Sequence, residues 1–216
     1  MGKKSYAVIG LGKFGYAVAE TLAKAGFEVM AVDTDEEIVH SIAKEVSYAA
    51  RADITETGVL ESLGISNVDV VIVGVAENME ASIMATIFAK EAGVKYVMAK
   101  AVNKLHATIL KKVGADEIIH PEWSMGTRVA KNLMSGGFVD FFELSSKFSL
   151  AELPVPEEWV GKTLIELNLR DKFGVNVVGV KVGDDVQVNV KPDEPFLEEQ
   201  TLMIVGENES LARLQR

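Results

Sequence analysis

Short apolar runs alternate along the first part of the chain with segments whose apolar residues recur every three or four positions. The apolar runs cover residues 5–10, 28–33, 46–52, 69–75, 95–102 and 116–121. The segments with helical periodicity between them cover residues 13–26, 35–46, 57–64, 78–93 and 105–115. This alternation predicts an α/β fold, a doubly wound parallel Rossmann sheet with strand order 3-2-1-4-5-6 and helices on both faces. Glycines that fit left-handed helix C-caps close several segments: Gly26, Gly64, Gly93 and Gly114.

A further helical segment over about 121–135 starts at Pro121 and stops before Gly136 and Gly137. Its apolar residues cannot all face one small core: Trp123, Met125, Val129, Leu133 and Met134. The segment is therefore either a buried closing helix of the first domain or a helix that crosses to a partner subunit.

The pattern changes from Phe148 onward, where strands outnumber helices. Strands are expected over 148–155, 175–182, 185–190 and 201–207, with one helix over 161–174 and a hairpin turn at Gly183–Asp185. We therefore expect two domains, a nucleotide-binding domain over 1–143 that includes the crossing helix and a small α+β C-terminal domain over 145–216.

The stretch "VIGLGKFG" places Gly10, Gly12 and Gly15 at the spacing G-x-G-x-x-G, directly after a predicted strand and before a predicted helix. Gly10 allows the chain to turn, Gly12 lets backbone N–H groups reach a phosphate, and Gly15 lets helix and sheet pack closely. Asp33 ends the second strand, where it would accept ribose hydroxyls and repel a 2′-phosphate, so NADP is disfavoured. This context predicts a nucleotide site with a phosphate at the helix N-terminus.

The carboxyl ends of the strands meet at one crevice, where ligands bind in such sheets. Lys13 could reach a terminal phosphate, although it could also be a solvated lysine, and Asn78 could be only a helix N-cap. The residues expected to bind the cofactor are Gly10, Gly12, Lys13, Phe14, Gly15, Asp33, Asp35, Asp53, Ile54, Val75, Ala76, Asn78 and Lys100.

Composition narrows the possible chemistry. The 216 residues contain no cysteine, which excludes disulfides, thiolate metal sites and cysteine nucleophiles. The net charge is −10, with no basic run, which argues against nucleic acid as a partner and against direct lipid insertion. We expect neither a signal peptide nor a membrane-spanning segment.

Catalytic candidates are poor. His40 falls within a predicted helix, His106 opens one and His120 ends a strand, and none has a partner at a motif spacing. Three functions stay open on the residues alone: a non-catalytic nucleotide-binding regulator, an NAD-dependent oxidoreductase that uses a crevice acid such as Glu122, and a scaffold without a ligand.

Longer motifs carry a resemblance to a known family. They are "YAVIGLGKFG", "VIVGVAEN", "GVKYVMAKAVN", "LKKVGADEIIHPEWSMG" and "GKTLIELNLRDKFGVNVVGVK". Over essentially its whole length, the chain resembles the RCK (regulator of potassium conductance) regulatory subunits of Ktr/Trk-type potassium-uptake systems. The resemblance implies a cytoplasmic homodimer, assembled into an octameric ring, that lies at the inner face of the membrane through its potassium-translocator partner. It implies no catalysis: ATP or ADP, with NAD(H) in relatives, binds in the crevice and changes the ring's shape and thereby the translocator's activity.

The resemblance also assigns individual residues. The glutamate of "HPE", Glu122, would lie at the dimer interface near the nucleotide phosphates and hold a divalent or monovalent cation. Lys13 stands where close relatives often have arginine, which keeps the charge but loses bidentate geometry, so discrimination between ATP and ADP could be weaker. Asn168 and Arg170 match residues near a cyclic di-AMP site at the C-terminal dimer interface of some relatives.

Overall fold

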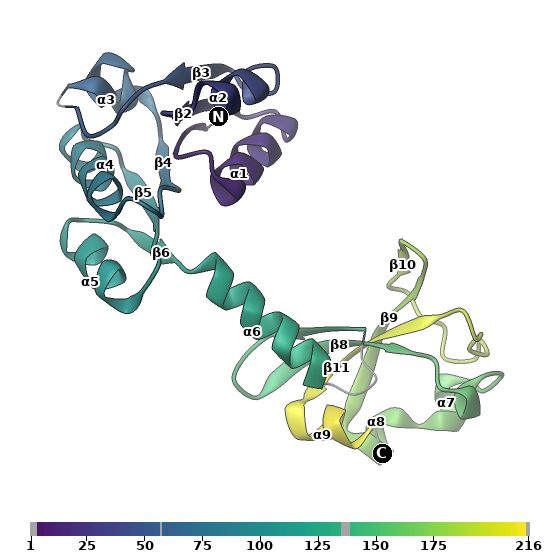
Figure 1. Ribbon diagram of the computed structural model, residues 1–216. Helices are drawn as coiled ribbons and strands as arrows, with labels where there is room; N and C mark the ends of the chain where they lie inside the picture. The colour runs from purple at the N-terminus through teal and green to yellow at the C-terminus, as the bar shows by residue number, and fades with distance from the viewer. Residues whose placement is uncertain (1–3, 57, 135–138, 215–216) are drawn as a thin grey trace. The chain divides into compact units, whose positions relative to one another are not determined.

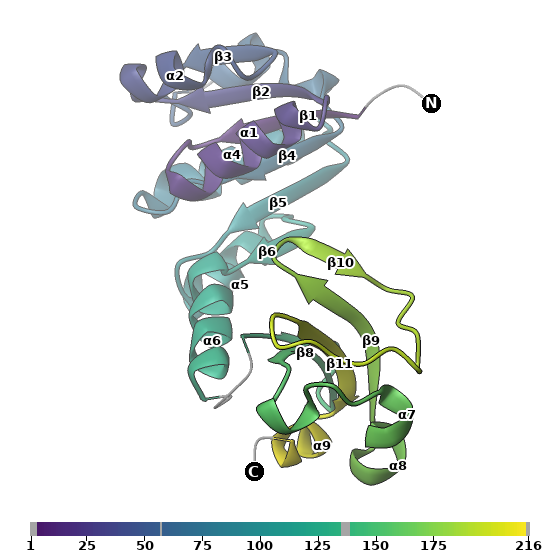
Figure 2. The same ribbon diagram turned by 90° about the vertical axis from the view of Figure 1, so that its right-hand side faces the viewer.

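A computed structural model describes residues 4–56, 58–134 and 139–214 of the chain. The chain forms two compact units, Met1–Glu122 and Trp123–Arg216 (Figures 1 and 2). Each unit has its own sheet and its own buried core, so the two are described separately.

The first unit contains a six-stranded parallel sheet. Its strands are β1 (Ser5–Ile9), β2 (Glu28–Asp33), β3 (Tyr48–Arg51), β4 (Val70–Val73), β5 (Tyr96–Lys100) and β6 (Glu117–Ile119). They lie in the order β3-β2-β1-β4-β5-β6, and Val8 of the central β1 stands opposite Ala31 on one side and Ile72 on the other. The predicted doubly wound sheet and its strand order are confirmed.

Helices cover both faces of this sheet. They are α1 (Lys13–Lys24), α2 (Glu36–Ile42), α3 (Val59–Ser62), α4 (Met79–Glu91) and α5 (Lys104–Lys112), and a short 3-10 turn, η1, spans Ile65–Asn67. Side chains alternate along β1, so that Ala7 and Ile9 pack with the core under α3, α4 and α5, while Val8 packs with Ala19 of α1 and Ile42 of α2. All four glycines expected to end helices have positive φ: Gly26, Gly64, Gly93 and Gly114.

Helix α6 (Pro121–Met134) begins at the proline, as predicted, and has no buried residue. The face of α6 that carries Arg128, Lys131 and Asn132 pairs with the acidic side chains of Asp140 and Glu143. Because α6 runs from one compact unit into the other, the expected boundary near residues 143 to 145 stays a prediction.

The second unit contains a five-stranded antiparallel sheet in the order β10-β9-β11-β8-β7. The strands are β7 (Asp140–Glu143), β8 (Phe148–Pro154), β9 (Val175–Val182), β10 (Asp185–Gln187) and β11 (Thr201–Glu207). The helices are α7 (Leu164–Leu167), α8 (Leu169–Phe173) and α9 (Asn208–Arg213), with a 3-10 turn, η2, at Glu157–Trp159. Trp159, Phe196 and Leu211 pack with the apolar face of the sheet. The predicted α+β composition and the hairpin at Gly183 are confirmed.

One predicted element of this unit is wrong. The single helix expected over 161–174 is divided into α7 and α8, because Asn168 between them has the left-handed conformation, with φ 45°. Asparagine is one of the few residues that tolerate this region. Strand β7 and helix α9 were not predicted either.

Candidate functional site

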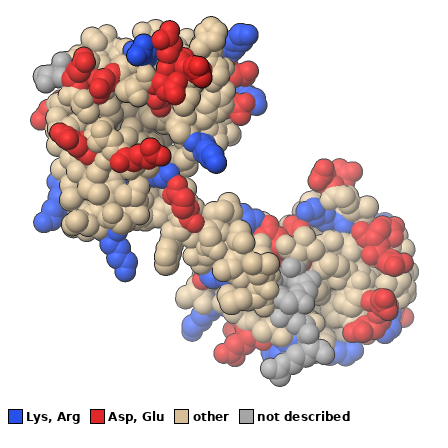
Figure 3. All heavy atoms as spheres, viewed as in Figure 1, with Lys and Arg blue, Asp and Glu red and all other residues tan. Residues whose placement is uncertain are grey.

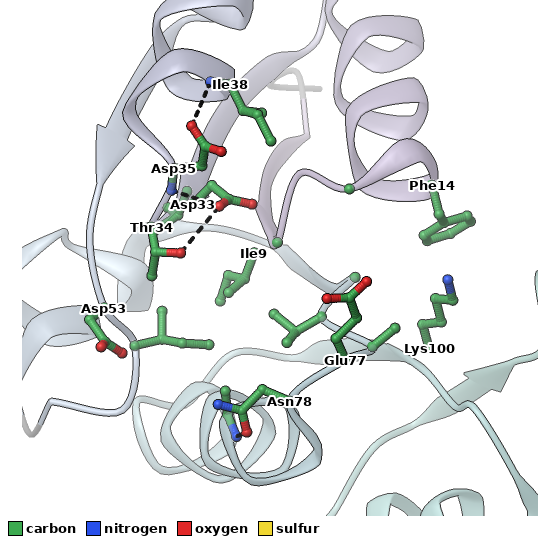
Figure 4. Close-up of a pocket in the computed structure, with 18 of the residues that line it drawn as sticks. Ile9, Phe14, Asp33, Thr34, Asp35, Ile38, Asp53, Glu77, Asn78 and Lys100 are labelled. Atoms are coloured by element: carbon green, nitrogen blue, oxygen red, sulfur yellow. Dashed lines mark hydrogen bonds between the residues drawn. The ribbon is translucent and has the colours of Figure 1, made fainter.

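A cavity of about 930 Å³ lies in the first unit, at the carboxyl ends of its central strands (Figure 4). The cavity lies beside β1 and β4. From β1 the chain continues toward one edge of the sheet through β2 and β3, and from β4 it continues toward the other edge through β5 and β6. Almost every residue predicted for the site lines this cavity: Gly10, Gly12, Lys13, Phe14, Asp33, Asp35, Asp53, Ile54, Val75, Ala76, Asn78, Lys100 and Glu122. Gly15 does not line it and lies behind the loop.

The glycine loop between β1 and α1 follows the geometry expected for each glycine. Gly10 has φ 87°, and a Cβ there would lie 2.7 Å from atoms of Val75. A Cβ at Gly15 would lie 1.9 Å from the carbonyl oxygen of Gly10, so only glycine fits where α1 meets the loop. At Gly12 nothing lies within 4 Å of the Cβ position, so this residue faces the open cavity.

The first turn of α1 lacks the side-chain cap that α2, α4 and α5 have; the short α3 also starts at a glycine, Gly58, without such a cap. Asp35, Asn78 and Asn103 accept hydrogen bonds from first-turn N–H groups of α2, α4 and α5. The N-cap of α1 is Gly12, which has no side chain, and no acidic residue occupies its first turn. The N–H groups of α1 and the positive end of its dipole are therefore free to bind an anion in the cavity.

Asp33 at the end of β2 is held in place by backbone donors. The Leu11 N–H donates to its Oδ2 at 2.5 Å, and the Asp35 N–H donates to its Oδ1 at 2.9 Å. Oδ1 also accepts from the Thr34 hydroxyl at 3.5 Å, whereas Oδ2 can still accept a second hydrogen bond, so the side chain can bind a hydroxyl group of a ligand. Figure 4 shows Asp33 at the cavity, and its expected binding of a ribose stays a prediction.

Two other predicted residues have structural tasks. Asp35 caps α2 by accepting from the Glu37 N–H at 2.9 Å, and Asn78 caps α4 by accepting from the Ala81 N–H at 3.0 Å. Both still line the cavity, so the structure supports the N-cap interpretation of Asn78 without removing it from the site.

The loop after β3 supplies Asp53 and Ile54. Asp53 accepts hydrogen bonds from the Thr55 hydroxyl at 2.7 Å and the Thr55 N–H at 2.9 Å, and these bonds hold the pKa of its carboxyl below the usual value. Ile54 is buried and presents an apolar surface beside Asp53. A polar group next to an apolar wall is suited to a planar base.

Lys100, at the end of β5, forms an ion pair with Glu122. The side chain of Lys100 is 10% exposed, whereas that of Glu122 is 70% exposed. The Lys100 ammonium also lies 5.9 Å from the centre of the Phe14 ring. Hydrogen bonding from Lys100 lowers the pKa of the Glu122 carboxyl, which is therefore ionised at neutral pH. A phosphate in the cavity would compete with Glu122 for Lys100.

Sequence reasoning missed Glu77, whose exposed carboxylate projects into the cavity between Ile9 and Lys100 (Figure 4). It also missed Thr34 and Thr55 in the cavity wall. One signal could have identified Glu77: it comes after the carboxyl end of β4 and directly before the N-cap of α4. The lining then has five carboxylates, Asp33, Asp35, Asp53, Glu77 and Glu122, against two lysines, Lys13 and Lys100.

The histidines make no catalytic group with these residues. His106 is fully buried, and burial followed by the nearby His120 lowers the pKa of its ring. The ring Nδ1 of His120 lies 3.1 Å from the Ala101 carbonyl oxygen, and His40 is exposed on α2. Among the residues that the structure describes, no three His, Asp or Glu side chains gather closely enough to hold a metal ion.

Asn168 and Arg170 belong to the second unit and do not line the cavity. Both are exposed. Asn168 lies between α7 and α8, and Arg170 is the second residue of α8. On the face shown in Figure 3, the described basic side chains are scattered among acidic ones and form no broad patch.

Comparison with known proteins identifies the family. The TrkA-N domain matches residues 6–121 and the TrkA-C domain matches residues 150–216. The Ktr system potassium uptake protein C of Bacillus subtilis is 41% identical over 214 residues, 99% of this chain and 97% of that protein. Protein A of the same organism's Ktr system is 36% identical over 212 residues, 98% of this chain and 96% of that protein.

Solved structures share the fold. The GsuK channel bound to NAD has a TM-score of 0.61 and 16% identity to this chain. The aligned region covers 99% of this chain and 39% of the GsuK chain. The Kef C-terminal domain of Shewanella denitrificans in its AMP-bound form has a TM-score of 0.52 and 14% identity, covering 61% of this chain and 80% of its own. At these identities the likeness concerns the fold alone.

Within the described ranges, no helix is long and apolar enough to cross a membrane. The resemblance to RCK proteins is confirmed, and with it the prediction of a regulatory protein, so an NAD-dependent oxidoreductase is no longer a candidate. The chain belongs to the RCK family of Ktr potassium-uptake regulatory proteins, which are not enzymes, and it carries one TrkA-N and one TrkA-C domain.

Proposed function

We propose that this protein is a nucleotide-sensing regulatory subunit that gates a membrane potassium translocator by responding to ATP and ADP. The observation that carries the proposal is the cavity lined by both the uncapped start of α1 and Asp33. The free N–H groups of α1 suit a phosphate and the Asp33 carboxylate suits a ribose, while Asp53 and Ile54 offer a surface for the base.

Several residues then have defined tasks. The N–H groups that follow Gly12 hold a phosphate, Lys13 reaches a terminal phosphate from the start of α1, and Lys100 approaches from β5. When phosphate draws Lys100 away from Glu122, the exposed Glu122 carboxylate loses its counter-charge, and a divalent or monovalent cation can neutralise it instead. Nucleotide charge would reach the start of α6 through this ion pair.

Helix α6 supports the proposed homodimer. Its uncovered side chains include Trp123 at 79% exposure, Leu133 at 81% and Met134 at 75%. An apolar surface of this kind on a short helix is typical of an interface. We assign it to a second copy of the chain, so that two Glu122 residues lie near each other and dimers assemble into an octameric ring.

The same proposal places the protein in the cytoplasm, at the inner face of the membrane, held there by its translocator partner. The relatives are named for potassium uptake, and a regulator without a spanning helix among its described residues needs a protein partner to act on that process. Cyclic di-AMP is proposed as a second ligand in the C-terminal domain, near Asn168 and Arg170, with direct calorimetric titration as its test.

Calorimetric titration with ATP, ADP and NADH tests the nucleotide proposal. We expect micromolar binding of ATP and ADP by the parent chain and loss of both in Gly12→Asp, because a carboxylate there would occupy the phosphate position. Binding of NADH alone would make NAD(H) the ligand. Absence of ATP and ADP binding in the micromolar range would exclude the proposed nucleotide sensing.

Gating needs a second experiment. In liposomes that contain a Ktr-type translocator and this protein, rubidium uptake should differ between ATP and ADP. In liposomes that contain the translocator and the Gly12→Asp variant, uptake should not respond to nucleotide. Equal uptake with both nucleotides in the presence of the parent protein would contradict nucleotide-dependent gating.

A further inference from the structure

We infer that Glu77 sets the selectivity of the cavity for nucleotide charge, by opposing the outer phosphates of the ligand. The inference rests on the proposed nucleotide site and adds to it a residue that the glycine motif does not include. Glu77 lines the cavity together with Gly12, Lys13 and Lys100.

The backbone fixes where Glu77 stands. Its neighbour Asn78 is the N-cap of α4 and accepts from the Ala81 N–H at 3.0 Å, so the chain direction at residue 77 is set by the start of the helix. The Glu77 side chain is exposed, and Figure 4 shows it directed into the cavity with its carboxylate on the side of the glycine loop.

The sheet brings Glu77 and the phosphate end of the site together. Strands β1 and β4 are hydrogen-bonded neighbours, and the loops that follow them touch: a Cβ at Gly74 would lie 2.7 Å from the Gly10 carbonyl oxygen. The loop after β1 leads to the N–H groups of α1, and the loop after β4 leads to Glu77. A phosphate at α1 would therefore have the Glu77 carboxylate across from it.

The charges around Glu77 are not balanced within the described ranges. Lys100 is paired with Glu122, and no described residue forms a hydrogen bond or ion pair with the Glu77 side chain. Each phosphate added to the ligand brings more negative charge toward this carboxylate, and the repulsion is strongest at low salt. Affinity should therefore rise less with phosphate number than it would without Glu77.

Titration of three nucleotides against matched variants tests this inference. ATP, ADP and AMP are titrated into the parent chain, Glu77→Gln, Glu77→Asp and Glu80→Gln, with EDTA present and at low salt. Glu80 lies in the first turn of α4 and is exposed but does not line the cavity, so Glu80→Gln makes the same charge change outside it.

We expect Glu77→Gln to raise the ATP to AMP affinity ratio by about three- to tenfold, with ADP between. Glu77→Asp and Glu80→Gln should keep the parental ratio. The difference should disappear at about 1 M salt, where the Debye length falls to about 3 Å.

Two results would overturn the inference while leaving the nucleotide site intact. One is an unchanged or lowered ATP to AMP ratio in Glu77→Gln. The other is an equal loss of affinity for all three nucleotides, which would mean that Glu77 binds the ribose that they share. If the parent chain and every variant bind none of the three, the proposed nucleotide site itself is wrong.

Discussion

The carboxylate of Asp33 accepts a hydrogen bond from the backbone N–H of Leu11, which ties the end of β2 to the glycine loop after β1. The two residues are 22 positions apart in the chain. A side chain proposed to bind the ligand therefore also holds the loop that would bind the phosphate, and the two tasks can be separated by substitution.

Asp33→Ala should lower the free energy of unfolding by about 1–3 kcal/mol, because the partly buried Leu11 N–H loses its acceptor. Asp33→Asn keeps one acceptor oxygen, which can serve the Leu11 N–H or the Asp35 N–H but not both, so it should retain part of that stability. It should still weaken nucleotide binding by about tenfold, or about 1.4 kcal/mol, because a charged acceptor is lost. Urea denaturation and calorimetric titration measure the two effects, and equal stability losses in both variants would contradict the separation.

Replacing Gly15 or Gly12 by alanine should have different effects, the first on stability and the second on phosphate binding. Gly15→Ala places a methyl group 1.9 Å from the Gly10 carbonyl oxygen and should lower the free energy of unfolding by about 3 kcal/mol or more. Gly12→Ala meets no atom within 4 Å and has φ −57°, so it should fold like the parent chain and lose phosphate binding. Circular dichroism with thermal unfolding checks the first result, and titration with ADP checks the second. A stable Gly15→Ala variant would contradict the packing at this loop.

The buried His106 should make stability depend on pH. Its pKa in the folded chain is lowered from 6.5 by burial, so the unfolded state binds more protons below that pH. The His106 contribution to stability is fully present above pH 6.5 and is lost as pH falls below it, with a slope of at most about 1.4 kcal/mol per pH unit.

Urea denaturation of the parent and His106→Leu between about pH 7 and pH 5 tests this dependence. In His106→Leu the free energy of unfolding should fall less steeply with decreasing pH, because the proton that binds His106 in the unfolded state no longer contributes. His40 is exposed on α2, so His40→Gln is the control and should follow the parent chain. An unchanged slope in His106→Leu would show that other groups cause the acid sensitivity.

The apolar face of α6 should determine the oligomeric state. Leu133 is 81% exposed within one chain, and Leu133→Asp places a charge in the proposed interface, so it should shift the protein toward monomers. Leu133→Met keeps an apolar side chain and should behave like the parent. Light scattering after size-exclusion chromatography gives the masses. Identical masses for all three proteins would place the dimer interface elsewhere.

The left-handed conformation of Asn168 gives a further prediction. Asn168→Gly should leave the free energy of unfolding nearly unchanged, because glycine adopts positive φ without strain. Asn168→Ala should lower it by about 1–2 kcal/mol. Thermal or urea denaturation distinguishes the two, and equal stability of both variants would contradict the observed break between α7 and α8.

Much of the first unit could be predicted because its signals are local. The sheet order follows from alternation of strands and helices, and the glycine motif is recognised within one short stretch, where Gly15 meets Gly10 and Gly10 has positive φ. Nearly all predicted site residues came together because carboxyl ends of parallel strands meet at one edge. Their roles in binding stay predictions.

Other features depend on contacts that spacing does not reveal. The sequence around Asn168 has the periodicity of a continuous helix, so it does not indicate that Asn168 has positive φ. Glu77 looks like an ordinary solvated acid until β1 and β4 are placed side by side, and the pairing of Lys100 with Glu122 joins residues 22 positions apart. Strand β7 has the sequence Asp-Phe-Phe-Glu, in which polar and apolar residues do not alternate.

If the proposed nucleotide binds at the open first turn of α1, the ligand takes part in folding. Asp35, Asn78 and Asn103 complete their own helices, whereas the turn after Gly12 would be completed by the bound phosphate. A ligand present at a hundred times its dissociation constant adds about 2.7 kcal/mol to the stability of the state that binds it. Cellular proteases act on the unfolded fraction, so the survival time of this regulator would rise and fall with its nucleotide supply.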